Sequence, residues 1–160
     1  MGERRGLDMV MDPERSVDLA WKTLNEYGNE VGWKKITNTK DAYNKPSNDP
    51  FVDLKRHLSA KEIKTPYFGY AYSKFNVPSK RRALLLFGAN DMISIWINGR
   101  RVVNELETQG QKDREAVEVQ LRSGENEVLI KVGCPRDQRL GFVFRLAELD
   151  GKPFADFQNE

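Results

Sequence analysis

Residues 83–104, ALLLFGANDMISIWINGRRVVN, decide the fold that the sequence predicts. An apolar run over Ala83–Ala89 ends at Asn90-Asp91, and an alternating run over Met92–Ile97 ends at Asn98-Gly99. An Asn-Gly pair between two strand-like runs predicts a hairpin with a type I′ turn, because both central residues of that turn need positive φ. The stretch therefore predicts antiparallel β structure with one buried face.

The rest of the sequence carries similar strand-like segments, separated by turn residues. Strands are predicted over these further segments: 32–36, 67–77, 117–121, 128–132 and 141–149. The segment 51–54 is short and apolar, and a turn of helix over 53–63 is left open. Two polar stretches, 37–50 and 104–114, are predicted to be long loops. About seven or eight short strands predict an all-β sandwich of two antiparallel sheets. We expect one domain over residues 12–160, after a flexible tail over 1–11.

The composition fits a soluble globular domain, with 39% hydrophobic residues, 31% charged residues and a net charge of +2. Such weak and mixed charge argues against nucleic-acid binding, which needs basic residues gathered on one face. The short basic cluster Lys80-Arg81-Arg82 is interpreted as a solvated turn. No apolar stretch reaches the roughly 20 residues of a membrane span, and residues 1–11 lack the apolar core of a secretory signal.

No motif in the sequence marks an active site or a cofactor site. It contains no Gly-rich phosphate loop, nucleophile elbow or zinc signature. The single cysteine, Cys134, has only His57 as a potential base, so we interpret it as a small, half-buried filler rather than a nucleophile. The carboxylates are too many to exclude a catalytic pair by counting, but none stands out, so neither enzyme activity nor a cofactor is predicted. A structural calcium ion is a weaker alternative, because the candidate aspartates have no regular ligand spacing. These aspartates are Asp41, Asp49, Asp53 and Asp91.

Spaced motifs along the chain resemble a known family of domains. They are Ile95-Trp96-Ile97-Asn98-Gly99, Leu121-Arg122-x-Gly124-x-Asn126 and Gly141-Phe142-x-Phe144. In this order they resemble galactose-binding-like β-sandwich domains, the jelly-roll modules appended to bacterial glycoside-degrading and surface proteins. The resemblance spans about residues 12–154 and implies a jelly roll that binds carbohydrate. It also implies an extracellular or cell-surface location within a larger protein, with adjoining domains as potential partners.

The sequence departs from the resembled domains at two places. Met92 replaces the usual Gly after Asn-Asp, so the turn there is expected to differ. Arg139-Leu140 stands where many of these domains carry a Trp. If that Trp is a sugar platform in the family, this chain lacks it.

The segment over 13–27 gives two conflicting predictions. With Asp12 as N-cap and Pro13 at the first helical position, its apolar periodicity predicts a helix as far as Tyr27. The resembled domains are extended at the counterpart of Val17-Asp18-Leu19, so the resemblance implies an extended segment instead.

A carbohydrate site needs flat aromatic rings for C–H-rich sugar faces, and amide, carboxylate or guanidinium groups for the hydroxyls. The candidates of these types are Trp96, Trp33, Tyr43, Tyr72, Asn90, Asp91 and Arg139. Alternation places Ile93, Ile95 and Ile97 in the core, so Trp96 is predicted to point to the opposite face. That face is either open to a ligand or covered by another chain segment. We favour covering, because large aromatic residues usually find burial.

Most of the other candidates also have structural interpretations. Trp33 and Tyr43 flank a polar loop, and a core Trp33 beside a solvated loop is the simpler interpretation. Tyr70 and Tyr72 share one strand face, which fits cross-strand packing as well as a glycan platform. Asn90-Asp91 fits a turn shaped by side-chain hydrogen bonds.

The sequence thus leaves three functions open. The first is a non-catalytic carbohydrate-binding module, which the resemblance implies. The second is a structural or protein-interaction module, since a fold does not fix a function. A free-standing hydrolase is the weakest of the three.

Overall fold

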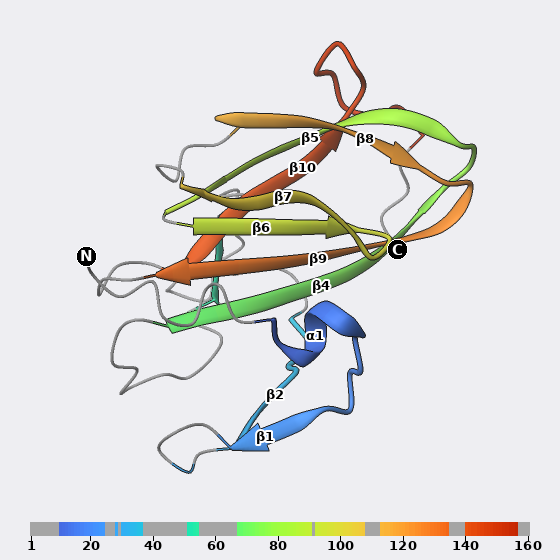
Figure 1. Ribbon diagram of the computed structural model, residues 1–160. Helices are drawn as coiled ribbons and strands as arrows, with labels where there is room; N and C mark the ends of the chain where they lie inside the picture. The colour runs from blue at the N-terminus through green and yellow to red at the C-terminus, as the bar shows by residue number, and fades with distance from the viewer. Residues whose placement is uncertain are drawn as a thin grey trace.

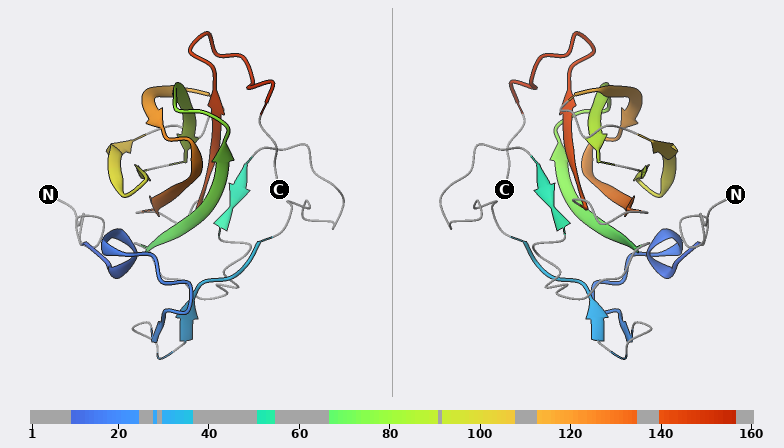
Figure 2. Two further views of the ribbon diagram at one scale, coloured as in Figure 1. Left: turned by 90° about the vertical axis from the view of Figure 1, so that its right-hand side faces the viewer. Right: turned by 90° about the vertical axis from the view of Figure 1, so that its left-hand side faces the viewer.

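A computed structural model describes the protein over residues 10–24, 28, 30–36, 51–54, 67–90, 92–107, 113–134 and 140–156. Within these residues, two four-stranded antiparallel sheets pack face to face as a β-sandwich (Figures 1 and 2). Two short strands, β1 (Lys22–Leu24) and β2 (Glu30–Gly32), pair as a separate ribbon beside the sandwich. The predicted all-β sandwich is confirmed.

The two sheets have the strand order of a jelly roll. The β5 sheet has the order β3-β10-β5-β8, with bounds Val52–Asp53, Gly141–Ala147, Arg81–Ala89 and Glu115–Leu121. The β6 sheet has the order β4-β9-β6-β7, with bounds Tyr67–Val77, Gly124–Cys134, Met92–Ile97 and Arg100–Glu107. If the eight sandwich strands are numbered along the chain with β3 as the first, the β5 sheet has the order 1-8-3-6 and the β6 sheet has the order 2-7-4-5. This alternation between two sheets is the jelly-roll arrangement.

Strands β6 and β7 form the predicted hairpin. Asn98 and Gly99 connect them with φ of 51° and 74°, the left-handed values that a type I′ turn needs. β7 continues to Glu107, so the predicted loop over 104–114 is wrong in its first part. The pairing register between β6 and β7 shifts along the hairpin, as at a β-bulge. Because of these shifts, β7 stays paired with β6 as far as Glu107.

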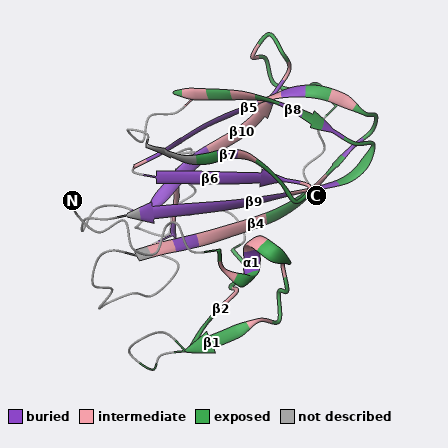
Figure 3. Ribbon diagram, viewed as in Figure 1, coloured by how far each residue is buried: buried purple, intermediate pink, exposed green. Residues whose placement is uncertain are grey.

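The core lies between the inner faces of the two sheets. Ile93, Ile95 and Ile97 of β6 enter it, as their alternation predicts. The other strands contribute alternate residues that include Leu85, Phe87, Val119, Leu121, Val128, Ile130, Val132 and Phe142. In Figure 3, β6 and β9 are drawn as buried over most of their length. The hydrophobic pattern of the strands therefore fixes which face of each sheet is internal.

The chain after Met11 is helical for one turn only. α1 spans Asp12–Arg15, and Ser16 is already extended, with φ of −161° and ψ of 131°. The N-cap is Met11, not the predicted Asp12, and the predicted helix is wrong over the described residues from Ser16 to Leu24. A helix is stabilised mainly by packing of its apolar face, and Leu24 on that predicted face is 66% exposed. The non-helical segment after Ser16 is closer to what the resemblance implies.

The basic cluster is not a solvated turn, because its two arginines belong to β5. Arg81 pairs with Asp156 at 2.7 Å, and its guanidinium lies 5.2 Å from the ring centroid of Phe154. Arg82 pairs with Glu118 of the neighbouring strand β8. Phe154 is buried in the core cluster and holds the C-terminal segment against the sandwich.

Some strand ends differ from the predicted ones. The predicted strand over 32–36 is wrong after Gly32, where β2 loses its partner because Lys22 begins β1. β9 begins at Gly124, inside a predicted turn, and β10 ends at Ala147 rather than at Leu149.

Candidate functional site

Three of the candidate residues, Trp96, Tyr72 and Trp33, gather at the outer face of the β6 sheet. Trp96 of β6 is 7% exposed but does not belong to the core cluster of the isoleucines, so its predicted opposite orientation is confirmed. Trp96 pairs with Leu129 of β9, and Leu129 pairs with Tyr72 of β4. Directly paired residues of antiparallel strands point to the same face. Tyr72, Leu129 and Trp96 therefore form a line across the sheet, here called the Trp96 row.

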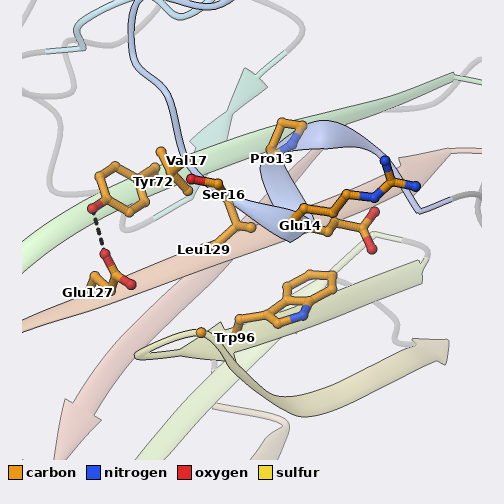
Figure 4. A pocket seen from close by; sticks show the side chains of 10 residues that line it. Pro13, Glu14, Ser16, Val17, Tyr72, Trp96, Glu127 and Leu129 are labelled. Atoms are coloured by element: carbon orange, nitrogen blue, oxygen red, sulfur yellow. Dashed lines mark hydrogen bonds between the residues drawn. The ribbon is translucent and has the colours of Figure 1, made fainter.

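The N-terminal segment covers this row. Residues 11–17, here called the strap, contain α1 and lie against the outer face of the β6 sheet (Figures 1 and 4). A cleft of about 70 Å³ remains between strap and sheet. Its lining residues are Pro13, Glu14, Arg15, Ser16 and Val17 from the strap, and Tyr72, Trp96, Gly99, Glu127 and Leu129 from the sheet. Of the two interpretations of Trp96, the structure shows the covered one.

Groups of opposite charge line the cleft beside the rings. Glu127 accepts a hydrogen bond of 2.8 Å from the Tyr72 hydroxyl (Figure 4). Burial, together with this bond and the charge of Glu127, raises the pKa of Tyr72 to about 12, so the hydroxyl remains a donor at neutral pH. The Arg15 side chain is 71% exposed, and its ion pair with Asp12 is long, at 3.9 Å. The cleft thus combines ring surface with a carboxylate and an accessible guanidinium.

A buried ion pair joins the strap to the sheet. Lys131 Nζ lies 2.7 Å from Glu14 Oε1, and the two side chains are 4% and 7% exposed. The Tyr70 hydroxyl donates to the same Glu14 oxygen at 2.5 Å. Lys131 also lies 5.2 Å from the ring centroid of Phe68 and 5.8 Å from that of Tyr70, in reach of cation–π attraction. The Glu14 carboxylate is therefore held by two donors from two strands.

The protonation states of this cluster follow from its contacts. Burial by itself raises the pKa of Glu14, but the hydrogen bonds from Lys131 and Tyr70 and the charge of Lys131 outweigh burial. The net pKa of Glu14 therefore lies below its usual 4.5. Burial and the neighbouring Glu14 carboxylate both raise the pKa of Tyr70, which keeps its hydroxyl protonated.

Sequence patterns do not reveal this pair. Alternation places Lys131 opposite the inward-facing valines and isoleucine of β9, but Glu14 lies 117 positions earlier in the chain. The one local signal of the ion pair is a lysine inside an apolar strand. Lysine is almost never fully buried unless it is paired, so its position implies a partner of opposite charge.

Trp33 also lies next to the Trp96 row. Its ring packs edge-on against Tyr72, with centroids 6.2 Å apart and planes at 63°. The Nε1 atom of Trp33 is buried, and no described residue accepts a hydrogen bond from it. Such a donor is uncommon in native structures and marks a place where an acceptor would be stabilising.

Asn90, the remaining candidate among the described residues, does not lie at this cleft. Asn90 follows β5 and precedes β6, whereas Trp96 lies near the far end of β6, so the strand from Met92 to Trp96, about 13 Å long, separates them. The calcium candidate Asp53 lies in β3. Several predicted residues fall outside the described residues: Tyr43, Asp91, Arg139, Asp41, Asp49, His57 and the side chain of Cys134. The same holds for the predicted loop over 37–50.

The asparagines of the resembled motifs organise turns. Asn98 Nδ2 donates to Asn126 Oδ1 at 2.9 Å, and Asn98 Oδ1 accepts from the backbone N–H of Glu127 at 3.0 Å. Asn126 is fully buried, and its Nδ2 donates to the carbonyl oxygens of Arg122 and Gly124. These bonds join the β6–β7 turn to the start of β9, so both asparagines have structural roles.

Comparisons with known proteins give no match. No family model, no curated protein and no solved structure matches the chain. Among the residues that the structure describes, no helix has the length and apolar character needed to cross a membrane.

Proposed function

We propose that this chain is a non-catalytic carbohydrate-binding module of the galactose-binding-like type, acting within a larger secreted or cell-surface protein. The observation that carries the proposal is the cleft at the Trp96 row. There, Trp96 and Tyr72 lie beside Glu127 and Arg15. The jelly-roll strand order and the resembled motifs support the family assignment.

The chemistry of the cleft suits a neutral sugar. The rings of Trp96 and Tyr72 offer apolar surface to the C–H face of a pyranose. The Glu127 carboxylate can accept hydrogen bonds from sugar hydroxyls, and the Arg15 guanidinium can donate to sugar oxygens. Of the two carboxylates that line the cleft, Glu14 is paired with Lys131, which leaves Glu127 and the Arg15 guanidinium, so we expect no strong preference for acidic glycans.

The size of the cleft limits what it holds while the strap is in place. A volume of about 70 Å³ is far below the range of about 300–1,000 Å³ typical of sites that enclose a small molecule. We therefore expect contact with one edge of a sugar residue and weak binding, which suits a module that holds a polysaccharide by repeated contacts.

Affinity gel electrophoresis and a glycan array with plant and algal polysaccharides test the proposal. We expect retention on at least one glycan, and a loss of affinity of about tenfold in Glu127→Gln or Trp96→Phe. Glu118→Gln is the control, because Glu118 lies on β8 of the other sheet and pairs with Arg82. A folded protein that no glycan retains would contradict the proposal, and turnover of chromogenic glycosides or esters would contradict its non-catalytic part.

A structural or protein-interaction module is the second candidate. It is favoured by the strap over the Trp96 row and by apolar side chains exposed on or beside the β1–β2 ribbon. These are Leu19, Leu24, Val31 and Ile36, which are 60%, 66%, 37% and 39% exposed. If this alternative is right, chemical cross-linking of the full-length protein should join the ribbon to an adjoining domain. The double variant Leu24→Ser and Val31→Ser should then lose these cross-links. Unchanged cross-links would argue against it.

A further inference from the structure

We propose that the strap over residues 11–17 is a gate, which closes over the Trp96 row and is held shut by Glu14. Opening the gate uncovers Trp96 for ligand. The ligand in this inference is the carbohydrate of the proposed function, but the opening itself is a property of the chain and is measured without any ligand.

The strap is attached to the sheet mainly through Glu14. Its carboxylate accepts from Lys131 on β9 and Tyr70 on β4, at 2.7 and 2.5 Å. Pro13 is the one strap residue that is fully buried, whereas Arg15 and Ser16 are exposed. Among the contacts between described residues, the Glu14 carboxylate and the buried Pro13 are therefore what holds the segment on the sheet.

The strap has little stability of its own. α1 is four residues long, which is far too short to persist as an isolated helix. Among the described residues, the core cluster of the sandwich contains none from the strap. Segments with few buried contacts open locally without unfolding the rest of the protein. Opening the strap therefore leaves the packing between the two sheets intact.

An open strap would present a platform of sugar-binding character. Tyr72, Leu129 and Trp96 lie on adjacent strands in register, so about 10 Å separates the outer two across the sheet. In the closed state the cleft admits only part of a sugar ring. With the strap lifted, a whole ring can lie on the indole of Trp96 beside Glu127, while Arg15 moves away with the strap and Lys131 becomes hydrated.

Hydrogen exchange followed by mass spectrometry on the whole chain tests the gate. Glu14→Ala removes the attachment and should raise exchange of the strap amides at least about tenfold, because a lone buried charge at Lys131 favours the open state. The amides to follow are those of Glu14 and Ser16, which donate to the carbonyls of Met11 and Asp12. Amides of the core strands β6 and β9 should keep their protection.

Two further variants make this test graded. Tyr70→Phe keeps the ion pair and removes one hydrogen bond, so a smaller rise of about threefold is expected. Asp12→Ala is the control within the strap, because the Asp12 side chain is 66% exposed and forms only a long ion pair. Strap exchange in Glu14→Ala and Tyr70→Phe that equals the wild type would overturn the gate.

Ligand binding separates the gate from the proposed function. If a glycan is found, Glu14→Ala should bind it about threefold to tenfold more tightly, because more of the protein is competent to bind. Equal affinity for wild type and Glu14→Ala would overturn the gate while the function stands. If no glycan binds either protein, the proposed function fails, and the exchange measurement alone decides whether the strap opens.

Discussion

The side chain of Asn126 ties two parts of the sandwich together. It is fully buried, and its amide forms hydrogen bonds with Asn98, with both backbone groups of Arg122 and with the carbonyl of Gly124. No hydrophobic residue can replace these bonds, since their partners would remain buried without them. The pairing of Asn98-Gly99 with a later Gly-x-Asn in this sequence thus has a physical cause in the turns.

Replacement of Asn126 by Ala should reduce the free energy of unfolding by about 2–4 kcal/mol, because several polar groups lose their partner at once. Urea denaturation followed by circular dichroism measures the change. Asn76→Ala is the control, since Asn76 is exposed on β4 and should cost less than about 0.5 kcal/mol. If both variants reduce the free energy of unfolding by a similarly small amount, the hydrogen bonds of Asn126 contribute little to stability.

Two glycines should respond to alanine for different reasons. At Gly141, an added Cβ would lie 2.3 Å from the carbonyl oxygen of Val52 and 2.6 Å from the Phe51 ring, so backbone must move. At Gly99 nothing lies within 4 Å, but φ is +74°. We expect losses of about 2–3 kcal/mol at Gly141 and about 1 kcal/mol at Gly99, measured by thermal unfolding. An equal or reversed order would mean that β3 adapts easily to the new methyl group.

At the scale of elements, the strap and the β6 sheet interact through ionisable groups. The Glu14 carboxylate faces Lys131 of β9 and Tyr70 of β4, while Arg15 and Asp12 flank it on α1 and Glu127 lines the same cleft. The net pKa of Glu14 in the folded protein is lowered. Ionised Glu14 therefore stabilises the closed strap, and protonated Glu14 does so less.

Acidification should open the strap. The contribution of Glu14 is complete above its usual pKa of 4.5 and is lost as the pH falls through its lower folded value. The indole N–H resonance of Trp96, followed by nuclear magnetic resonance from pH 7 to pH 3, should shift with a midpoint below 4.5. Glu14→Gln should lack this transition. The same transition in that variant would assign it to another carboxyl group.

At the scale of the whole molecule, the sandwich and the N-terminal segment contribute unequally to stability. The buried core cluster of the described residues draws on the strands of both sheets and on Leu54, Leu140 and Phe154. Of the described N-terminal residues, Pro13–Val17 and Trp33 pack on the outside of the β6 sheet, and Lys22–Leu24 and Glu30–Gly32 form the ribbon. The jelly roll should therefore fold without the strap.

Deletion of residues 1–17 should preserve a cooperative unfolding transition. The melting temperature should fall by no more than about 10 °C, which corresponds to roughly 3 kcal/mol for a domain of this size. Calorimetry and far-ultraviolet circular dichroism measure both properties. Loss of the cooperative transition would mean that the strap is part of the folding unit.

Local features of the fold could be predicted because their causes are local. Positive φ at Asn98-Gly99 and the period of two in Met92–Ile97 depend on neighbouring residues alone, and they fix the hairpin and the outward orientation of Trp96. Tyr67–Val77 was predictable with its bounds for the same reason. The aromatic part of the candidate site, Trp96 and Tyr72, follows from this alternation.

Only the tertiary structure shows which segment covers the rings of Trp96 and Tyr72 and which charged side chains form ion pairs. The apolar spacing over 13–27 predicts a helix, yet the chain leaves the helix after Arg15, and the strap that follows this path meets the sheet through Pro13 and Glu14. The contact between Glu14 and Lys131 joins residues 117 positions apart, and no local pattern encodes such a distance. Sequence thus determined the strands, their faces and the turn, since these arise from backbone geometry over a few residues. Burial of Trp96 and the closed cleft arise from packing between distant segments, which only the folded chain specifies.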